Sequence, residues 1–445
     1  MDDIKFQTKL IDMSYQIKTC SYEKDATRIL FNRIDNDDLQ YNKKQWLNTA
    51  VEIGEYLLNI SIIGYDKAKN RTWVSSSLDT VNESSVTITP VGDDLYNGNS
   101  GIALFLTYLG YITKDSRFEL AAKEAMQSSI RFIENIQNDQ KTPIGAFNGI
   151  CGSLYTIFKM YHLLKDDSCA KYCIRYLEII KSQIEKDMIF DLIGGSTGCL
   201  AVMLSIYENS DNEVIRNLAI DNANLCYLHL HNNKKLTTLG GISWGDDKLF
   251  LSSSGFAHGV SGTIAFLSKL MAITKDNNIK KTIDEALYFE QHLFSEKHGN
   301  WYMNSKKEKV CYGWCHGAPG ILASKVMIKK YHTETNILNV DLEMKLAFQT
   351  TISKCFGLNP SLCHGDLGQL DILLGASHMF KEFKLINGCN NTFNDFFDHV
   401  ILKRWRQGVL RGTESVGLMN GLSGFGYALL RFYAPQSIPS VLMLE

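Results

Sequence analysis

The chain has 445 residues, of which 45% are hydrophobic and 21% charged, so it can bury a sizeable core. Its formal net charge of −2, without a basic cluster, argues against a nucleic-acid-binding surface. No apolar run reaches the roughly 18 residues of a membrane-spanning helix, and the charged start, Met1 to Lys5, does not resemble a secretion signal. The 11 cysteines are scattered, which predicts a reduced, cytoplasmic protein rather than a disulfide framework.

The first 90 residues come before any internal repeat. Trp46–Leu58 has the composition of an amphipathic helix. Residues 70–92 contain two short segments rich in serine, threonine and valine, which predict a small β-hairpin. We expect residues 1–90 to lead into the repeats at 91–445, so that the whole chain, residues 1–445, forms a single domain.

One motif recurs seven times after residue 90: a glycine, two residues, a second glycine and then an apolar run. Its glycine pairs are Gly98/Gly101, Gly149/Gly152, Gly195/Gly198, Gly259/Gly262, Gly317/Gly320, Gly365/Gly368 and Gly421/Gly424. Successive first glycines are 46 to 64 residues apart, a spacing that suits two helices with their connections.

Two kinds of helix alternate with this motif. The stretches before the motifs are amphipathic and charged, whereas those after them, such as Ile102–Leu109 and Ala201–Ile206, are apolar and suit an inner layer. The expected outer helices are Trp46–Leu58, Phe118–Ile136, Ala170–Glu185, Glu213–His231, Ile279–Phe294, Leu342–Cys355 and Phe393–Trp405. The pattern predicts an all-α fold, an α/α toroid of seven outer and seven inner helices with a small β-hairpin and loop insertions. Residues 232–254, which carry Trp244, are an insertion without an assigned purpose.

The residue before the first glycine of each motif is expected to point toward a central cavity. In chain order these residues are Asn97, Asn148, Gly194, His258, His316, His364 and Asn420. A ring of polar side chains around a cavity mouth is where a functional site is expected. The three asparagines can alternatively hold the backbone at the helix starts.

Two motifs also place a thiol in the same slot, Cys315 before His316 and Cys363 before His364. Thiolates and imidazoles are ligands that zinc prefers. The two cysteines lie 48 residues apart, so the fold would have to bring them together. Three ligands, Cys315, Cys363 and His364, would leave the open position of a catalytic zinc. The alternative is that these side chains only pack.

The triplets Ala257-His258-Gly259, Trp314-Cys315-His316 and Cys363-His364-Gly365 resemble the LanC-type lanthionine cyclases. The longer segments around these two cysteines, together with residues 94–98 and 439–445, are similar to the C-terminal cyclase domain of class II lanthipeptide synthetases, the LanM type. The resemblance runs from about Val91 to the end of the sequence.

This resemblance implies an α/α toroid with one Zn²⁺ held by Cys315, Cys363 and His364. It also implies cyclisation of a ribosomal precursor peptide whose serines or threonines are already dehydrated. Residues 1–90 are too few for a kinase-like dehydratase and hold no glycine-rich phosphate loop. We therefore expect no dehydratase activity here, and either an excised domain or a stand-alone cyclase that works with a separate or fused dehydratase.

The predicted chemistry is the addition of a cysteine thiolate to dehydroalanine or dehydrobutyrine. A zinc-bound thiol is deprotonated, and two protein thiolates already neutralise the metal, so a third stays nucleophilic. The enolate that forms needs a proton at its α-carbon and a hydrogen-bond donor at its oxygen. His258 is the candidate acid, because an unperturbed histidine pKa of ~6.5 suits proton exchange at neutral pH. A cavity histidine bonded to a helix end is the alternative.

Two further residues are candidates for catalysis. Asp191 matches a position where the family keeps an aspartate, and it could accept the thiol proton, orient His258 or simply cap a helix. His316 is placed beside the zinc ligands or in proton transfer, with a fourth zinc ligand as the alternative. Some family members have an arginine where this sequence has Cys311, so the donor to the enolate oxygen is unassigned.

Two other functions are compatible with the same motifs. Eukaryotic LanC-like proteins resemble this sequence but add glutathione to dehydrated residues, and the C-terminal segment 439–445 argues against that function. A zinc-stabilised peptide-binding scaffold without catalysis is the third possibility. The presence of His258 and Asp191 beside three zinc ligands argues against it.

Overall fold

The computed structural model describes residues 36–64, 69–78, 86–136, 140–245, 252–331, 339–357, 359–380 and 415–445, together with Phe393 and Phe397. Helices dominate this part of the chain, as predicted, and its strands form only two-stranded antiparallel sheets. It divides into two compact units. The first unit comprises Met1–Gln127, Phe356–Asp371 and Glu382–Ile438, and the second comprises Ser128–Cys355, Ile372–Lys381 and Pro439–Glu445. The expectation of a single domain stays a prediction.

A helix begins directly after the first glycine of all seven motifs. These helices are α3 (Asn99–Thr113), α6 (Ile150–Leu164), α8 (Ser196–Asn209), α10 (Val260–Thr274), α12 (Ala318–Tyr331), α14 (Asp366–Phe380) and α16 (Leu422–Tyr433). Their first turns are almost entirely buried, in α8 without a break from Ser196 to Ile206. The expectation of apolar helices after the motifs is confirmed.

Close backbone contacts explain why the motif needs its second glycine. A Cβ atom on Gly262 would lie 2.1 Å from the carbonyl oxygen of Phe256, and one on Gly198 would lie 2.1 Å from that of Leu192. Both oxygens belong to the sixth residue before the glycine. A rigid carbonyl cannot yield as a side chain does, so only glycine lets the incoming loop pack against its helix.

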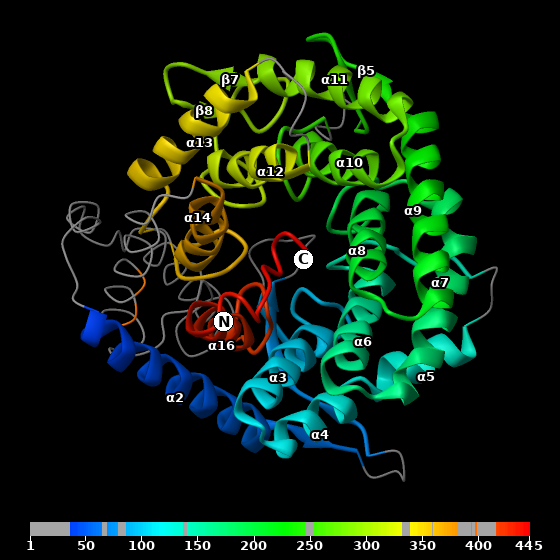
Figure 1. Ribbon diagram of the computed structural model, residues 1–445, viewed down its shortest axis with the longest axis vertical. Helices are drawn as coiled ribbons and strands as arrows, with labels where there is room; N and C mark the ends of the chain where they lie inside the picture. The colour runs from blue at the N-terminus through cyan, green and yellow to red at the C-terminus, as the bar shows by residue number, and fades with distance from the viewer. Residues whose placement is uncertain are drawn as a thin grey trace, which may run out of the picture. The chain divides into compact units, whose positions relative to one another are not determined.

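Amphipathic helices cover these apolar ones. They are α2 (Asn36–Ile60), α4 (Ser116–Ala125), α5 (Gln127–Asn135), α7 (Ala170–Gln183), α9 (Glu213–Asn233), α11 (Asn277–His292) and α13 (Val340–Lys354), with short 3₁₀ turns at Asp167–Cys169 and Ile184–Lys186. Within the second unit, α8, α10 and α12 lie side by side, and α9, α11 and α13 cover them in turn (Figure 1). In the first unit, α2 packs along α16 and α3.

Two outer helices differ from expectation or lie beyond the structure. The predicted helix Phe118–Ile136 divides at Met126, whose N–H is shared between the carbonyls of Ala122 and Glu124 and interrupts the regular ladder. The predicted helix Phe393–Trp405 lies outside the described residues except for Phe393 and Phe397.

The strands are short. In the first unit, β1 (Ile62–Ile63) pairs with β2 (Arg71–Thr72), and β3 (Val74–Leu78) pairs with β4 (Val86–Pro90), which confirms the expected hairpin. In the second unit, β5 (Lys235–Leu236) pairs with β6 (Ile242–Ser243), and β7 (Phe294–Ser295) with β8 (Asn300–Trp301). The β5–β6 pair lies inside the 232–254 insertion.

A buried ion cluster ties inner and outer helices together in the second unit. The Lys325 ammonium of α12 lies 2.8 Å from a Glu290 carboxylate oxygen of α11 and 2.9 Å from one of Glu343 of α13. Ser261, in the first turn of α10, donates a 3.1 Å hydrogen bond to Glu290. Loss of one partner would leave a buried charge, which is costly, so the cluster fixes how α10 to α13 pack.

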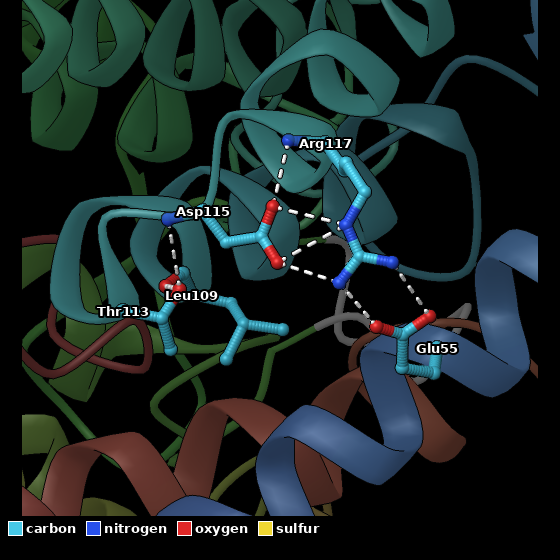
Figure 2. A network of polar contacts seen from close by, with 5 residues as sticks. All are labelled: Glu55, Leu109, Thr113, Asp115 and Arg117. Carbon is cyan, nitrogen blue, oxygen red and sulfur yellow. Dashed lines mark hydrogen bonds and ion pairs between the residues drawn. The ribbon is translucent and has the colours of Figure 1, made fainter.

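In the first unit, a group of ion pairs between helices lies at the surface rather than in the interior (Figure 2). Arg117 bridges two carboxylates, with 2.6 Å contacts to both Asp115 and Glu55 of α2. Asp115 also caps α4 by accepting the Arg117 N–H. The hydrogen bond from the Arg117 guanidinium, and then the one from its N–H, lower the pKa of Asp115. The Arg117 side chain is 59% exposed, so solvent screening leaves these ion pairs a small effect on stability.

No helix in the described ranges is both long and apolar enough to cross a membrane.

Candidate active site and metal ligands

Asp191 and His258 are in direct contact in the second unit. The His258 Nδ1 atom lies 2.8 Å from Asp191 Oδ2, while Asp191 Oδ1 accepts the Gly194 N–H at 2.8 Å. The two loops that carry these residues are joined by a backbone hydrogen bond of 3.0 Å from Leu192 N–H to the Ala257 carbonyl. The carboxylate is therefore held by its own turn and aimed at the imidazole of the next motif.

A second aspartate, Asp187, builds the loop that carries Asp191. Its buried carboxylate accepts the N–H groups of Ile189, Phe190 and Ser196, at 3.0, 3.1 and 2.7 Å, and the Ser196 hydroxyl at 2.5 Å. Phe190 has a φ of +63°, an uncommon conformation for a bulky residue. His229 of α9 supports the loop by stacking on Phe190 and by a 2.9 Å contact from Nε2 to the Asp187 carbonyl.

The division of labour between the two aspartates bears on the role of Asp191. The side chain that binds the start of α8 is that of Asp187, four residues earlier. One carboxylate oxygen of Asp191 accepts the N–H of a turn residue, and the other contacts the His258 ring. The side chain of Asp187, rather than that of Asp191, therefore binds the first N–H of α8.

His316 lies against His258 but has a different partner. The two rings are stacked, with centroids 5.4 Å apart and an interplanar angle of 22°. The Ser253 Oγ atom is 3.1 Å from His316 Nδ1, and it accepts the Gly255 N–H at 3.1 Å. A Cβ atom on Gly255 would lie 2.5 Å from His316 Nδ1, so the glycine leaves the space in which this ring sits.

These contacts follow one rule of the repeat. In four of the motifs, the residue four places before the first glycine lies against the residue just before the first glycine of another motif. Asp191 meets His258 in this way, and Gly255 meets His316. The same juxtaposition joins Gly145 to Gly194 in the second unit and Gly417 to Asn97 in the first.

The two stacked histidines have opposite pKa shifts. Burial disfavours the charged form of His258, but the hydrogen bond and negative charge of Asp191 outweigh it and raise the pKa of His258 above its usual value. Burial, and then the positive charges of His258 and Lys309, lower the pKa of His316 to about 3.

A cavity of about 360 Å³ opens beside these side chains. Asp191, His258 and His316 line one part of it. Another part is lined by Trp244, which is buried and comes from the insertion 232–254. The insertion therefore contributes a wall to the site, a role that the sequence did not reveal because the segment has no counterpart in the other repeats.

The three predicted metal ligands are divided between the units. Cys315 belongs to the second unit, where its carbonyl accepts the Ala257 N–H at 3.3 Å. Cys363 and His364 belong to the first, where the Cys363 N–H donates to the Met419 carbonyl at 3.2 Å. Within the described residues, no group of three or more His, Cys, Asp or Glu side chains gathers as a metal site. The donor types suit zinc, since thiolate sulfur and imidazole nitrogen are ligands that it prefers.

Comparison with known families decides what kind of protein this is. Residues 89–443, from β4 almost to the last residue, match the family described as "Lanthionine synthetase C-like protein". The chain belongs to this family. The resemblance to the LanC-type cyclases is thereby confirmed.

One curated relative of this LanC-like protein is considerably longer than this chain. It is 26% identical over 460 residues to "Lacticin 481/lactococcin biosynthesis protein LcnDR2" of Lactococcus lactis subsp. lactis, an alignment that covers 97% of this chain and 46% of the relative. The chain thus spans about half the length of that protein.

The structure of this LanC-like chain is similar to that of "Nisin cyclase", with a TM-score of 0.57 and 17% identity, over 79% of this chain and 92% of the other. At this identity the likeness shows the fold alone, and the predicted class, an α/α toroid, is confirmed.

Proposed function

We propose that this LanC-like protein is a zinc-dependent cyclase that forms lanthionine and methyllanthionine rings in a dehydrated precursor peptide. The observation that carries the proposal is the Asp191–His258 contact at 2.8 Å, beside a cavity, in a chain of this family. An acid of raised pKa, oriented by a carboxylate and accessible to a ligand, is what protonation of an enolate carbon requires.

Cys315, Cys363 and His364 would hold the zinc. A bound zinc ion would supply a substrate thiolate at neutral pH. His258, whose side chain is 44% exposed, can reach a bound peptide and would deliver the proton to the α-carbon of the enolate. Asp191 keeps the His258 ring in one orientation and favours its protonated form before that transfer.

His316 is assigned a different part of the reaction. Its ring lines the same cavity and is fixed by Ser253, so it is available to the substrate from a defined position. An imidazole N–H at this place can donate a hydrogen bond to the enolate oxygen. That oxygen has no other assigned donor, because this chain has Cys311 where some family members have an arginine. This assignment makes His316 a donor beside the zinc ligands rather than a ligand itself.

The chain would act as the cyclase part of a class II, LanM-type system. Its alignment with 46% of the lacticin 481/lactococcin biosynthesis protein leaves more than half of that protein outside the comparison. We infer that a dehydratase, separate or fused, supplies the dehydrated peptide, and that this chain alone removes no water from an undehydrated peptide.

The test is to incubate the purified chain and zinc with a synthetic peptide that contains one dehydroalanine and one cysteine. The free thiol should disappear without a change in peptide mass, because intramolecular addition moves atoms but releases none. Gain of one glutathione, when glutathione is present, would instead indicate the LanC-like addition. Binding without either change would indicate a scaffold.

Metal analysis tests the ligand set separately. We expect one zinc per chain, and its loss in both Cys315→Ala and Cys363→Ala. Cys311→Ala is the matched control, because this cysteine stands four residues before Cys315 and should leave the zinc content intact. A full zinc content in the first two variants would rule out the assignment.

A further inference from the structure

The cavity beside His258 is lined in part by apolar side chains that the proposed chemistry does not use. Met188, Ile189, Trp244 and Met303 are among its lining residues, together with Asp191 and the two histidines. Its volume of about 360 Å³ is at the lower end of the roughly 300–1,000 Å³ of ligand pockets, so it suits a single large side chain or a short segment.

The Trp244 ring is a fixed wall of this cavity. Its indole N–H donates a 2.7 Å hydrogen bond to the Leu230 carbonyl in α9, so its polar group is satisfied away from the cavity. The preceding residue, Ser243, belongs to β6 and is bound through its hydroxyl to Ser252. The side of the ring that faces the cavity therefore offers only apolar surface to a ligand.

Met188 and Ile189 are exposed although their loop is rigidly built. The two residues are 69% and 55% exposed, and both line the same cavity. The Asp187 carboxylate binds the Ile189 N–H and the start of α8, so the backbone holds them in place. Large apolar side chains fixed in this way beside a cavity are typical of a binding site, and methionine adapts to ligands of different shape.

We propose that this surface, formed by Met188, Ile189, Trp244 and Met303, binds an apolar side chain of the precursor peptide next to its dehydrated residue. The inference rests on the proposed function. His258 lines the same cavity as these apolar side chains, so the neighbour of a dehydrated residue placed at this acid, one Cα spacing of ~3.8 Å away, stays inside that cavity and can contact them. Ring formation is then selective for dehydrated residues with an apolar neighbour.

The test uses four synthetic peptides, each with one dehydroalanine and one cysteine. In two of them the residue before the dehydroalanine is leucine or asparagine, and in the other two the residue after it varies in the same way. We expect leucine to lower KM at one of the two places by roughly tenfold relative to asparagine, the discrimination typical of an apolar pocket, with little change in kcat.

Variants assign that preference to the surface. Ile189→Ser should remove most of the leucine preference, and Val214→Ser, which changes a residue that is also 55% exposed but on α9 away from the cavity, should retain it. Neither residue belongs to the buried core, so both variants should fold. Met188→Ser provides a second test at the cavity edge.

The outcomes separate this inference from the proposed function. Ring closure of all four peptides at equal KM, or a leucine preference that survives both Ile189→Ser and Met188→Ser, would overturn the inference and leave the cyclase intact. If no peptide closes, binding is measured with peptides that carry alanine instead of dehydroalanine. Tighter binding of the leucine peptide, lost in Ile189→Ser, would then uphold the surface even though the proposed activity had failed, and equal binding would overturn it.

Discussion

His258 and His316 both stand directly before the first glycine of their motifs, which are successive. Their rings stack on each other, yet their environments differ. The residue of the preceding motif that meets His258 is Asp191, and the one that meets His316 is Gly255. A carboxylate raises the pKa of the first histidine, whereas burial and neighbouring positive charge lower that of the second to about 3. The carboxylate of Asp191 thus favours the protonated form of His258, whereas burial and neighbouring positive charge favour the neutral form of His316.

The comparison teaches how a repeat protein can acquire an asymmetric site. The backbone of each motif is fixed by its glycines, which require the same loop geometry. The position four residues before the first glycine differs between motifs: it holds Asp191 in one and Gly255 in the next, where a Cβ atom would clash with the Cys315 carbonyl. Differences between repeats at this position are therefore a better guide to function than the shared glycines.

The largest expected effect follows from removal of the proposed acid. His258→Asn should slow ring closure by roughly 10²–10⁴-fold, the usual contribution of general acid–base catalysis. The side chain is 44% exposed, so the fold and the zinc content should be retained. Thiol consumption over time measures the rate, and an unchanged rate would exclude His258 as the acid.

Asp187 and Asp191 should differ in how much each contributes to the stability of the fold. Asp187→Ala leaves several buried N–H groups and the Ser196 hydroxyl without their acceptor, which should cost about 2–4 kcal/mol of unfolding free energy. Asp191→Ala removes one partly buried acceptor of a turn and the partner of the half-exposed His258 ring, and should cost about 1 kcal/mol. Denaturant unfolding measures both. Equal losses of stability would mean that the loop does not depend on Asp187.

Gly255→Ala tests whether this glycine makes room for His316. The added Cβ would lie 2.3 Å from the Cys315 carbonyl oxygen and 2.5 Å from His316 Nδ1, so we expect a loss of about 1–3 kcal/mol in stability from overpacking. Ring closure should also slow, because His316 must move.

Gly375→Ala is the control for that substitution. In this helical glycine of α14, the nearest atom to an added Cβ is the flexible Met443 Cε at 2.9 Å. A side-chain end can yield, so stability should be kept or gain up to about 1 kcal/mol. If the two variants are equally stable, Gly255 is not needed for space.

Much of the fold was predictable from sequence because its determinants are local. The spacing of two glycines marks each helix start, since a carbonyl six residues earlier packs on the second glycine. Alternation of charged and apolar stretches predicts which helices are buried. The division of Phe118–Ile136 at Met126 was not predictable, because neither proline nor glycine marks it.

The candidate site was only partly predictable because its contacts are between repeats. The sequence indicated Asp191 and His258 as candidate site residues. Their direct contact was harder to predict, because they are 67 residues apart and the contact follows only from aligning successive motifs. Asp187 was missed because it binds the start of α8 from nine residues away, outside the usual spacing of a helix cap. Trp244 was missed because its insertion has no repeat to compare it with.

The smallest expected effect concerns the tautomer of His316. Ser253 Oγ already accepts the Gly255 N–H, and its single proton is best used by donation to His316 Nδ1, which places the ring proton on Nε2. Ser253→Ala would release this preference, at a cost of about 0.5–1.5 kcal/mol for one hydrogen bond, and should slow ring closure a few-fold. Nitrogen-15 NMR of the imidazole reports the tautomer directly.

Ser252→Ala, which loses a hydroxyl paired with Ser243 instead, is the control and should leave that signal unchanged. An Nε2–H tautomer that persists in Ser253→Ala would show that the serine does not set the difference between the two histidines.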